Sequence, residues 1–172
     1  MIRAEKIWMD GKMVNWDDAK VHVLTHTLHY GTGVFEGIRA YEGHDGKTAV
    51  FRLKEHVKRL FQSAKINFIK IPFTESEIVE AIKEVLRANK LKAAYIRPLA
   101  FIGDGKMGLS AFDNPIHVII AAWPWETYLG DHGVEHGVRG KISSFTRMGI
   151  NSILSKAKSC ANYINSVWAK QE

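Results

Sequence analysis

AAYIRPLAFIG, residues 93–103, and HVIIAAW, residues 117–123, are two apolar stretches with a glycine-containing loop between them. Both are short and contain many β-branched and aromatic residues, which predicts two strands. The first carries Tyr95 and Arg97 two residues apart, so both side chains are expected on one face of that strand. A sheet is therefore the predicted framework of this part of the chain.

The region before these strands predicts a hairpin and two more strands. In KIWMDGKMVN, residues 6–15, two short apolar runs surround Asp10-Gly11, and a type I′ turn needs a positive φ at both of those positions. Residues 34–41, VFEGIRAY, and residues 48–53, TAVFRL, are predicted as the further strands. The segment that joins them contains another Asp-Gly pair, which favours a turn.

Two helices are predicted between the strands. KEHVKRLFQSAKIN, residues 54–67, places four apolar residues at helical spacing: Val57, Leu60, Phe61 and Ala64. Thr74 and Glu77 form a capping box immediately before IVEAIKEVLRAN, residues 78–89. Strands and helices in this order indicate an α+β fold class, with residues 1–122 as a small α/β domain.

The chain changes character after residue 122. WPWETYLGDHG, residues 123–133, mixes proline, aromatic residues and glycine, which predicts an interdomain loop. A short strand, GKISSFTR at residues 140–147, and a helix, SKAKSCANYINSVWAKQ at residues 155–171, are expected beyond it. Residues 134–172 are therefore predicted to be the start of a second domain.

Composition restricts the class of protein. The 172 residues are 46% hydrophobic and 24% charged, which is typical of a globular protein and not of a disordered, collagen-like or coiled-coil chain. No apolar run reaches the roughly 20 residues of a transmembrane helix, and no apolar signal-peptide region is present at the N-terminus. One cysteine cannot form an internal disulfide, which fits a reducing cytosol. A cytoplasmic protein with no membrane partner is expected.

The net charge of +6 points to an anionic ligand. Lysine and arginine residues are scattered along the chain instead of forming a basic run, and no RNA-binding or helix-turn-helix signature is present. A small anion is therefore favoured over nucleic acid as the ligand.

A histidine cluster provides the most conspicuous set of possible metal ligands. His22, His26 and His29 would share one face of a continuous helix. A closed metal site also needs a carboxylate or a thiolate, and neither stands at a matching offset nearby. Ordinary surface and packing histidines are the favoured interpretation, and a metal site is the alternative.

Three other segments carry groups that could bind a ligand. Residues 30–33, YGTG, resemble half of a phosphate cradle but lack its flanking strand and helix, so a tight turn is favoured. Tyr95 and Arg97 could bind a carboxylate together, or could emerge at a solvent-exposed edge. Lys156 and Lys158 stand among small residues that leave room for a carbonyl group, or are two surface lysines at a helix start.

Six segments of the chain form a recognisable series. They are KVHVLTHTLHYGTGVFEGIRAY (20–41), FRLKEHVKRLFQSAKI (51–66), AAYIRPL (93–99), GDGKMGL (103–109), VIIAAWPWETYLG (118–130) and KAKSCANY (156–163). In this order they resemble the branched-chain amino acid aminotransferases, which are class IV, fold-type IV pyridoxal-phosphate enzymes. The resemblance implies a small α/β domain, the start of a larger β-rich domain, and transfer of the amino group of leucine, isoleucine or valine to 2-oxoglutarate in a ping-pong cycle.

The resemblance assigns cofactor-binding roles to three residues and no role to a metal. Lys158, and not Lys156, matches the lysine that forms a Schiff base with pyridoxal 5′-phosphate and moves the proton during catalysis. Tyr163 resembles the tyrosine that hydrogen-bonds the phenolate oxygen of the cofactor. Arg59 resembles the arginine that binds the cofactor phosphate.

The resemblance also implies a substrate pocket that accepts both leucine and glutamate. Tyr95 would help to bind the α-carboxylate, and Arg97 would receive the side-chain carboxylate of glutamate. Tyr30 and Tyr128 would lie near Arg97. The aliphatic side chain of the substrate would be lined by Phe35, Gly37 and Trp125.

Leu109 stands where the family places an apolar residue that reaches the pocket of a neighbouring subunit, which implies a homo-oligomer of at least two chains. The groups that bind the pyridine nitrogen, the α-carboxylate and most of the phosphate match no residue here, so the 172-residue chain alone is expected to be inactive. A D-amino acid or amine transaminase of the same fold is the related alternative, although Tyr95 with Arg97 argues against it. A non-catalytic module that binds a small anion or a metal is the unrelated alternative.

Overall fold

The computed structural model describes residues 3–125, 130–149 and 151–172 of the chain. Its largest feature is a seven-stranded antiparallel sheet in the order β2-β1-β7-β6-β4-β5, with β3 also paired to β6. The strands are β1 (Lys6–Met9), β2 (Lys12–Asn15), β3 (Gly33–Phe35), β4 (Ile38–Glu42), β5 (Thr48–Val50), β6 (Ala94–Ile102) and β7 (Ile116–Trp123). One sheet with helices packed on it confirms the predicted α+β class.

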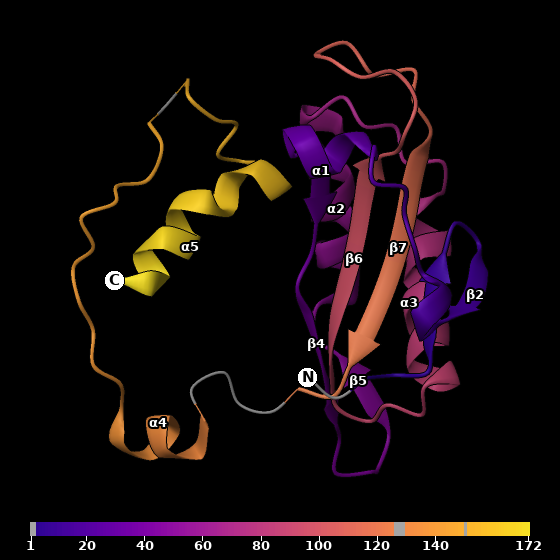
Figure 1. Cartoon of the computed structure of the whole chain (residues 1–172). Coiled ribbons are helices and arrows are strands. Elements are labelled where there is room, and N and C mark those ends of the chain that lie inside the picture. The colour runs from indigo at the N-terminus through magenta and orange to yellow at the C-terminus, as the bar shows by residue number, and fades with distance from the viewer. Residues whose placement is uncertain (1–2, 126–129, 150) are drawn as a thin grey trace.

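Two long helices cover one face of the sheet (Figure 1). They are α2 (Leu53–Ile66) and α3 (Glu75–Ala88). The shorter helices are α1 (His26–Tyr30), α4 (Gly130–His136) and α5 (Ile164–Gln171), with 3-10 turns η1 (Trp16–Asp18) and η2 (Cys160–Tyr163). Figure 1 shows α5, in yellow, on the opposite side of β6 from α3. In the described ranges no helix is both long and apolar enough to cross a membrane.

The N-terminal hairpin forms as its turn residues predict. Asp10 and Gly11 have φ angles of 49° and 91°, the left-handed values that a type I′ turn needs. The strands on either side of them, β1 and β2, are paired. Oδ1 of Asp10 also accepts a hydrogen bond from the N–H of Val118 in β7 at 2.7 Å. The turn is therefore fixed to the sheet as well as shaped by its own residues.

The core lies between the sheet and the two long helices. Ile38, Ile96 and Ile120, from three neighbouring strands, are fully buried and cluster with Leu60 of α2 and Ile82 of α3. Burial of one such side chain contributes roughly 1.5–3 kcal/mol. The residues of β6 alternate between the two faces of the sheet. We call the face that α2 and α3 leave uncovered the open face.

The prediction of a single strand over residues 34–41 is wrong in one respect. The structure divides this segment into β3 and β4, with Glu36 and Gly37 between them. Both strands pair with β6 in the same register. Between them, the N–H of Glu36 donates to the carbonyl of Pro98 at 2.9 Å. Pro98 has no N–H, so the ladder loses one hydrogen bond at this point.

Two other strand predictions need correction. The strand predicted at residues 48–53 ends early, because Arg52 has a left-handed φ of 46° and α2 begins at the next residue. The strand predicted at residues 140–147 is wrong, because none of these described residues is in a strand. Within the described ranges this segment pairs with no neighbouring strand, and an unpaired strand is not stable in water.

The helix predicted over residues 155–171 begins later than expected, with the turn η2. The carbonyl of Lys158 instead accepts a hydrogen bond from the N–H of Phe35 at 3.1 Å. Ser159 forms an isolated antiparallel bridge with Val34. A backbone that is bonded to a strand in this way cannot also make helical bonds, so the helix starts after Ser159.

The division of the chain into residues 1–122, 123–133 and 134–172 stays a prediction. Helix α4 begins inside the segment that was expected to be an irregular interdomain loop. The bridge between Val34 and Ser159 connects the first and the third of these parts.

Candidate functional site

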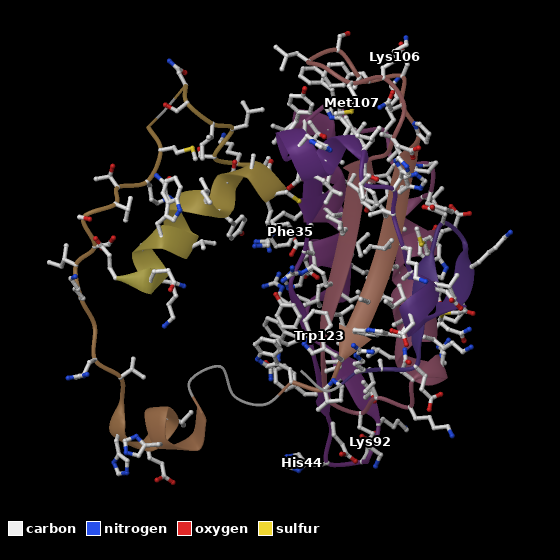
Figure 2. All side chains as sticks on the ribbon, in the orientation of Figure 1. Phe35, His44, Lys92, Lys106, Met107 and Trp123 are labelled. Atoms are coloured by element: carbon white, nitrogen blue, oxygen red, sulfur yellow. The ribbon has the colours of Figure 1, made fainter. Side chains whose placement is uncertain are left out.

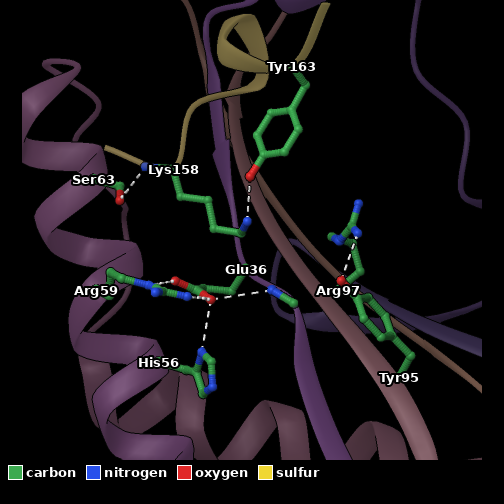
Figure 3. Close-up of polar contacts among 9 residues, drawn as sticks. Glu36, His56, Arg59, Ser63, Tyr95, Arg97, Lys158 and Tyr163 are labelled. Carbon is green, nitrogen blue, oxygen red and sulfur yellow. Dashed lines mark hydrogen bonds and ion pairs between the residues drawn. The ribbon is translucent and has the colours of Figure 1, made fainter. Parts of the chain in front are cut away.

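A buried carboxylate lies between the sheet and α2. Both oxygens of Glu36 accept hydrogen bonds from Arg59, Oε1 from Nε at 2.5 Å and Oε2 from Nη2 at 2.7 Å (Figure 3). His56, one turn earlier on α2, has its Nδ1 2.9 Å from Oε2. The side chain of Glu36 has no exposed surface, whereas that of Arg59 is about half exposed. Glu36 is therefore the inner partner of the pair.

The surroundings of Glu36 keep its carboxyl group charged. Burial alone raises the pKa of a carboxyl group, because it disfavours the charged form. The hydrogen bonds from Arg59 and His56, together with their charges, outweigh burial and hold the pKa of Glu36 below its ordinary value. The hydrogen bonds between Arg59 and Glu36 in turn raise the pKa of Arg59. The two side chains thus form a charged pair with bidentate geometry.

The backbone of Lys158 is fixed between α2 and β3. Its N–H donates to Oγ of Ser63 on α2 at 3.0 Å, and its carbonyl accepts from the N–H of Phe35. The next residue, Ser159, donates from Oγ to Oδ1 of Asn67 at 3.1 Å. Ser63 and Ser159 are buried, so the loss of either hydroxyl would leave an unpaired polar group away from water.

The amine of Lys158 contacts a phenol. Its Nζ donates to the hydroxyl of Tyr163 at 2.5 Å (Figure 3) and lies 4.7 Å from the centre of the Phe35 ring. Lys156, two residues earlier, is exposed. Lys158 is therefore the lysine of this segment whose amine is directed toward the sheet.

Tyr95 and Arg97 lie together on the open face of β6, as their spacing predicts. Nη2 of Arg97 donates to the hydroxyl of Tyr95 at 3.1 Å (Figure 3). The guanidinium carbon of Arg97 is 4.5 Å from the ring centre of Phe35. Nε of Arg97 is buried and has no hydrogen-bond partner among the described residues. A cation with an unused, buried donor is suited to an anionic ligand.

Gly37 makes room for the hydroxyl of Tyr95. A Cβ atom at position 37 would lie 2.1 Å from that oxygen and 2.9 Å from Cζ of the same ring. Both distances are far shorter than van der Waals contact. Any side chain at this position would displace Tyr95 and break its hydrogen bond to Arg97.

Aromatic rings extend the open face beyond Tyr95. The ring centre of Tyr95 is 5.2 Å from that of Trp123 and 5.2 Å from that of Trp125. Figure 2 shows Phe35 on the side of the sheet that faces α5. Nε1 of Trp123 and Nε of Arg39 are buried without a hydrogen-bond partner in the part of the chain that the structure describes. The open face therefore offers apolar surface and unused donors close together.

Two adjoining hollows open beside Lys158 and Tyr163. One has a volume of about 480 Å³ and is also lined by Phe35, Tyr95, Arg97, Leu99 and Cys160. The other has a volume of about 220 Å³ and is lined by Arg59, Arg147, Lys156, Asn162 and other described residues, none of which is acidic. The first hollow suits a ligand with apolar and anionic parts, and the second suits a strongly anionic group.

Cys160 is not suited to be the nucleophile of the first hollow. Burial raises the pKa of its thiol, although the positive charge of Arg97 lowers it in part. The thiol form of cysteine is a poor nucleophile. The structure therefore supports a lining role for Cys160.

A larger groove of about 560 Å³ lies at the C-terminal end of α3 and is lined by several cations. One of them, Lys92, lies far from Phe35 (Figure 2). Lys83 and Lys92 are paired with Glu80 and Glu42, and cations near a helix C-terminus are favoured by the helix dipole. The groove therefore needs no ligand to account for its charges.

Two of the predicted substrate-binding residues, Tyr30 and Leu109, lie outside this arrangement. Tyr30 is exposed at the end of α1, with its ring stacked 4.4 Å from that of His26. Leu109 is 88% exposed in the loop after β6. Tyr128 falls outside the described residues. The first two do not line either hollow next to Lys158.

The histidine cluster has other partners. His26 lies with Nδ1 2.8 Å from Oγ1 of Thr32 and Nε2 2.7 Å from the carbonyl of Gly108. Nε2 of His29 is 2.9 Å from the carbonyl of Val23. Over residues 3–125, 130–149 and 151–172, no group of three histidine, cysteine or acidic side chains is placed to hold a metal ion.

Sequence reasoning missed Glu36 and His56. The signal for Glu36 was present, because it alternates with Val34, Ile38 and Ala40, all of which are buried. A carboxylate on the buried face of a strand needs cationic partners. Their identity could not be predicted from the sequence, because His56 and Arg59 come from α2, 20 and 23 residues after Glu36.

A family model described as amino-transferase class IV matches residues 33–172. The branched-chain-amino-acid aminotransferase of Pseudomonas aeruginosa is 52% identical over 166 residues, which are 96% of this chain and 54% of that protein.

Two solved structures of the T.th. branched-chain amino acid aminotransferase have the same fold. The one with pyridoxamine 5′-phosphate has a TM-score of 0.93 at 49% identity and covers 99% of this chain and 56% of that chain. The one complexed with N-(5′-phosphopyridoxyl)-L-glutamate has a TM-score of 0.91 at 48% identity and covers 99% and 55%. This chain spans about half the length of the relatives that it matches.

Gly37→Ala is expected to destabilise the protein by roughly 1–3 kcal/mol, the usual cost of overpacking, because the new methyl group must displace the Tyr95 ring. Gly140→Ala is the matched control, since a Cβ there meets nothing within 4 Å, and it should change stability by less than about 0.5 kcal/mol. Urea unfolding measures both variants. Equal effects would contradict the close approach at Gly37.

Acid should remove the contribution of Glu36 to stability. Because its pKa is lowered, Glu36 stabilises the fold above the ordinary value of 4.5, and this contribution is lost as the pH falls through the lowered pKa. Below pH 4.5 we expect the unfolding free energy of the wild type to fall more steeply than that of Glu36→Gln, which has no carboxyl group to titrate at this position. Urea unfolding at several pH values measures this difference, and parallel curves would rule it out.

Proposed function

Because the chain belongs to the class IV aminotransferases, we propose that it acts in the pyridoxal 5′-phosphate-dependent transfer of the amino group of leucine, isoleucine or valine to 2-oxoglutarate. The names of the similar proteins support the branched-chain substrate class. The observation that carries the proposal is the hydrogen bond between Lys158 and Tyr163 at the junction of the two hollows.

The residues around Lys158 fit pyridoxal 5′-phosphate. Lys158 would hold the cofactor covalently, and Tyr163, whose hydroxyl already contacts the lysine amine, would hydrogen-bond its phenolate oxygen. Arg59 would bind the phosphate from the wall of the smaller hollow. Guanidinium groups bind phosphate oxygens through paired, charge-assisted hydrogen bonds, which suits Arg59 to this role.

The chain's own residues would supply the proton transfer. When bound, pyridoxal 5′-phosphate withdraws the electrons that remain on the substrate α-carbon after its proton leaves. Lys158 lines both hollows, which supports the proposal that its amine would carry that proton in each half of a ping-pong cycle. Tyr163 would hold the amine in position through their hydrogen bond, and Phe35 would shield one side of it from water.

The open face would bind the substrate. Arg97 would receive the side-chain carboxylate of glutamate from the wall of the larger of these two hollows. Tyr95 would help to bind the α-carboxylate, and Arg97 holds its hydroxyl in place. Phe35 and Trp125 would line an aliphatic side chain, and Gly37 would shape this part of the pocket by admitting the hydroxyl of Tyr95. One pocket would thus accept an acidic and an apolar substrate in turn.

Several finer features of the protein stay predictions. They are a homodimer in which Leu109 reaches a neighbouring subunit, substrate contacts from Tyr30 and Tyr128, a cytoplasmic location, and a site completed by groups that match the second half of the relatives. The activity measurements proposed below therefore use the complete enzyme that contains this chain. A comparison of L- and D-amino acids as donors separates the proposal from a D-amino acid transaminase of the same fold.

Lys158→Ala should abolish the covalent attachment of pyridoxal 5′-phosphate and lower the transamination rate by roughly 10²–10⁴-fold or more, because the acid–base group is lost. Lys156→Ala is the matched control and should keep the attachment. Borohydride reduction followed by mass spectrometry of the peptides locates the attached cofactor. A label on Lys156 would show that the wrong lysine has been assigned.

Arg97→Ala should lower kcat/KM for glutamate more than for leucine. The glutamate carboxylate loses a charge-assisted partner worth about 1.5–3 kcal/mol, which is roughly a 10- to 150-fold effect. Leucine carries no side-chain charge and serves as the internal control. Steady-state kinetics with both donors test this expectation, and equal losses would assign Arg97 a structural role only.

A further inference from the structure

Arg59 is a long side chain that is about half exposed, and such a side chain is normally free to adopt many rotamers. Here its Nε and Nη2 both donate to the carboxylate of Glu36. We propose that Glu36, supported by His56, is a positioning residue that fixes the guanidinium of Arg59 for the phosphate of the cofactor. This inference rests on the proposed function, because it concerns the phosphate of pyridoxal 5′-phosphate.

The carboxylate of Glu36 is a rigid reference point. The backbone N–H of Glu36 is bonded to Pro98 of β6, and the N–H of Gly37 donates to Oε2 of Glu36 at 3.3 Å. His56 contacts the same oxygen at 2.9 Å, and its side chain is only 20% exposed. Because the sheet and α2 hold this carboxylate on several sides, a guanidinium that binds both of its oxygens has one preferred orientation.

That orientation leaves Arg59 available to a ligand. Arg59 lines the smaller hollow beside Lys158, and Glu36 does not. The carboxylate therefore lies behind the guanidinium, on the side toward the core. Nη1 of Arg59 makes no hydrogen bond to Glu36 and none to any other described residue, while the opposite edge of the guanidinium is held.

Charge alone would give Glu36 the opposite effect. A carboxylate near a phosphate site repels the phosphate and offsets the charge of Arg59. If Glu36 acted only through its charge, its removal would strengthen phosphate binding. If it acts by positioning Arg59, its removal weakens phosphate binding despite the lost repulsion. The sign of the change therefore distinguishes the two roles.

The experiment measures the affinity that the phosphate itself contributes. The complete enzyme, freed of cofactor, is titrated with pyridoxamine 5′-phosphate and with pyridoxamine, which differ only in the phosphate and form no covalent bond with Lys158. Calorimetry gives both dissociation constants, and their ratio is the readout. Inorganic phosphate is titrated as an independent probe of the same site.

Glu36→Gln keeps the shape of the side chain but replaces one carboxylate oxygen with an NH₂ group. This group is a donor and cannot accept the hydrogen bond that Arg59 or His56 makes to that oxygen. We expect the affinity for pyridoxamine 5′-phosphate to fall about tenfold or more, as for one lost charge-assisted hydrogen bond, and that for pyridoxamine to change less than about twofold. Glu55→Gln is the matched control. It removes a carboxylate from α2, the helix that carries Arg59, but one that is paired with Arg52, and should leave the ratio unchanged.

Unchanged or tighter binding of pyridoxamine 5′-phosphate by Glu36→Gln would overturn the positioning role, as would an equal loss for both ligands. If the variant does not fold, His56→Ala answers the same question, because it keeps both bonds between Glu36 and Arg59. His56→Ala should weaken the binding of pyridoxamine 5′-phosphate relative to pyridoxamine by less than Glu36→Gln does. An unchanged ratio of the two dissociation constants would contradict the inference. A wild-type enzyme that binds both ligands equally would instead refute the proposed function, and the positioning role with it.

Discussion

Every second residue of β6 points toward helices α2 and α3, and the residues between them point the other way. This alternation lets one face of the sheet form the hydrophobic core and the other face carry the residues of the candidate site. Ile96 and its neighbours on β4 and β7 build the core, whereas Tyr95 and Arg97 face the hollow beside Lys158. The same rule acts on the connection between β3 and β4, where Phe35 and Gly37 lie on the open face and Glu36 faces α2. A shift of one residue in register would exchange the core for the site.

The second requirement of the site is that segments far apart in the sequence are fixed to one another. Lys158 is held by its backbone to Ser63 on α2 and to Phe35 on β3, and Ser159 is held to Asn67. These contacts fix the backbone of Lys158, and therefore the position of its Cα atom, without using the side-chain amine. They also end the helical pattern of the C-terminal segment at that point, because the backbone groups are already in use.

The six segments quoted from the sequence identified the family, and the match to the class IV aminotransferases confirms that identification. The two long helices, the capping box and the hairpin turn were also predicted, because each depends on residues within a few positions of one another. The strand at residues 140–147 was predicted wrongly, because strand formation depends on a partner that local composition does not reveal. The late start of the C-terminal helix has the same origin, since the bonds that exclude Lys158 from it come from α2 and β3.

The sequence by itself determined the fold class and the spacing that places Tyr95 beside Arg97. These follow from local periodicity and from motifs that are contiguous in the chain. Only the tertiary structure decided that Glu36 is the partner of Arg59, and that Tyr30 and Leu109 lie away from the two hollows. The physical reason is that a buried charge takes its partner from whatever element packs against it, and packing joins residues without regard to their separation in sequence.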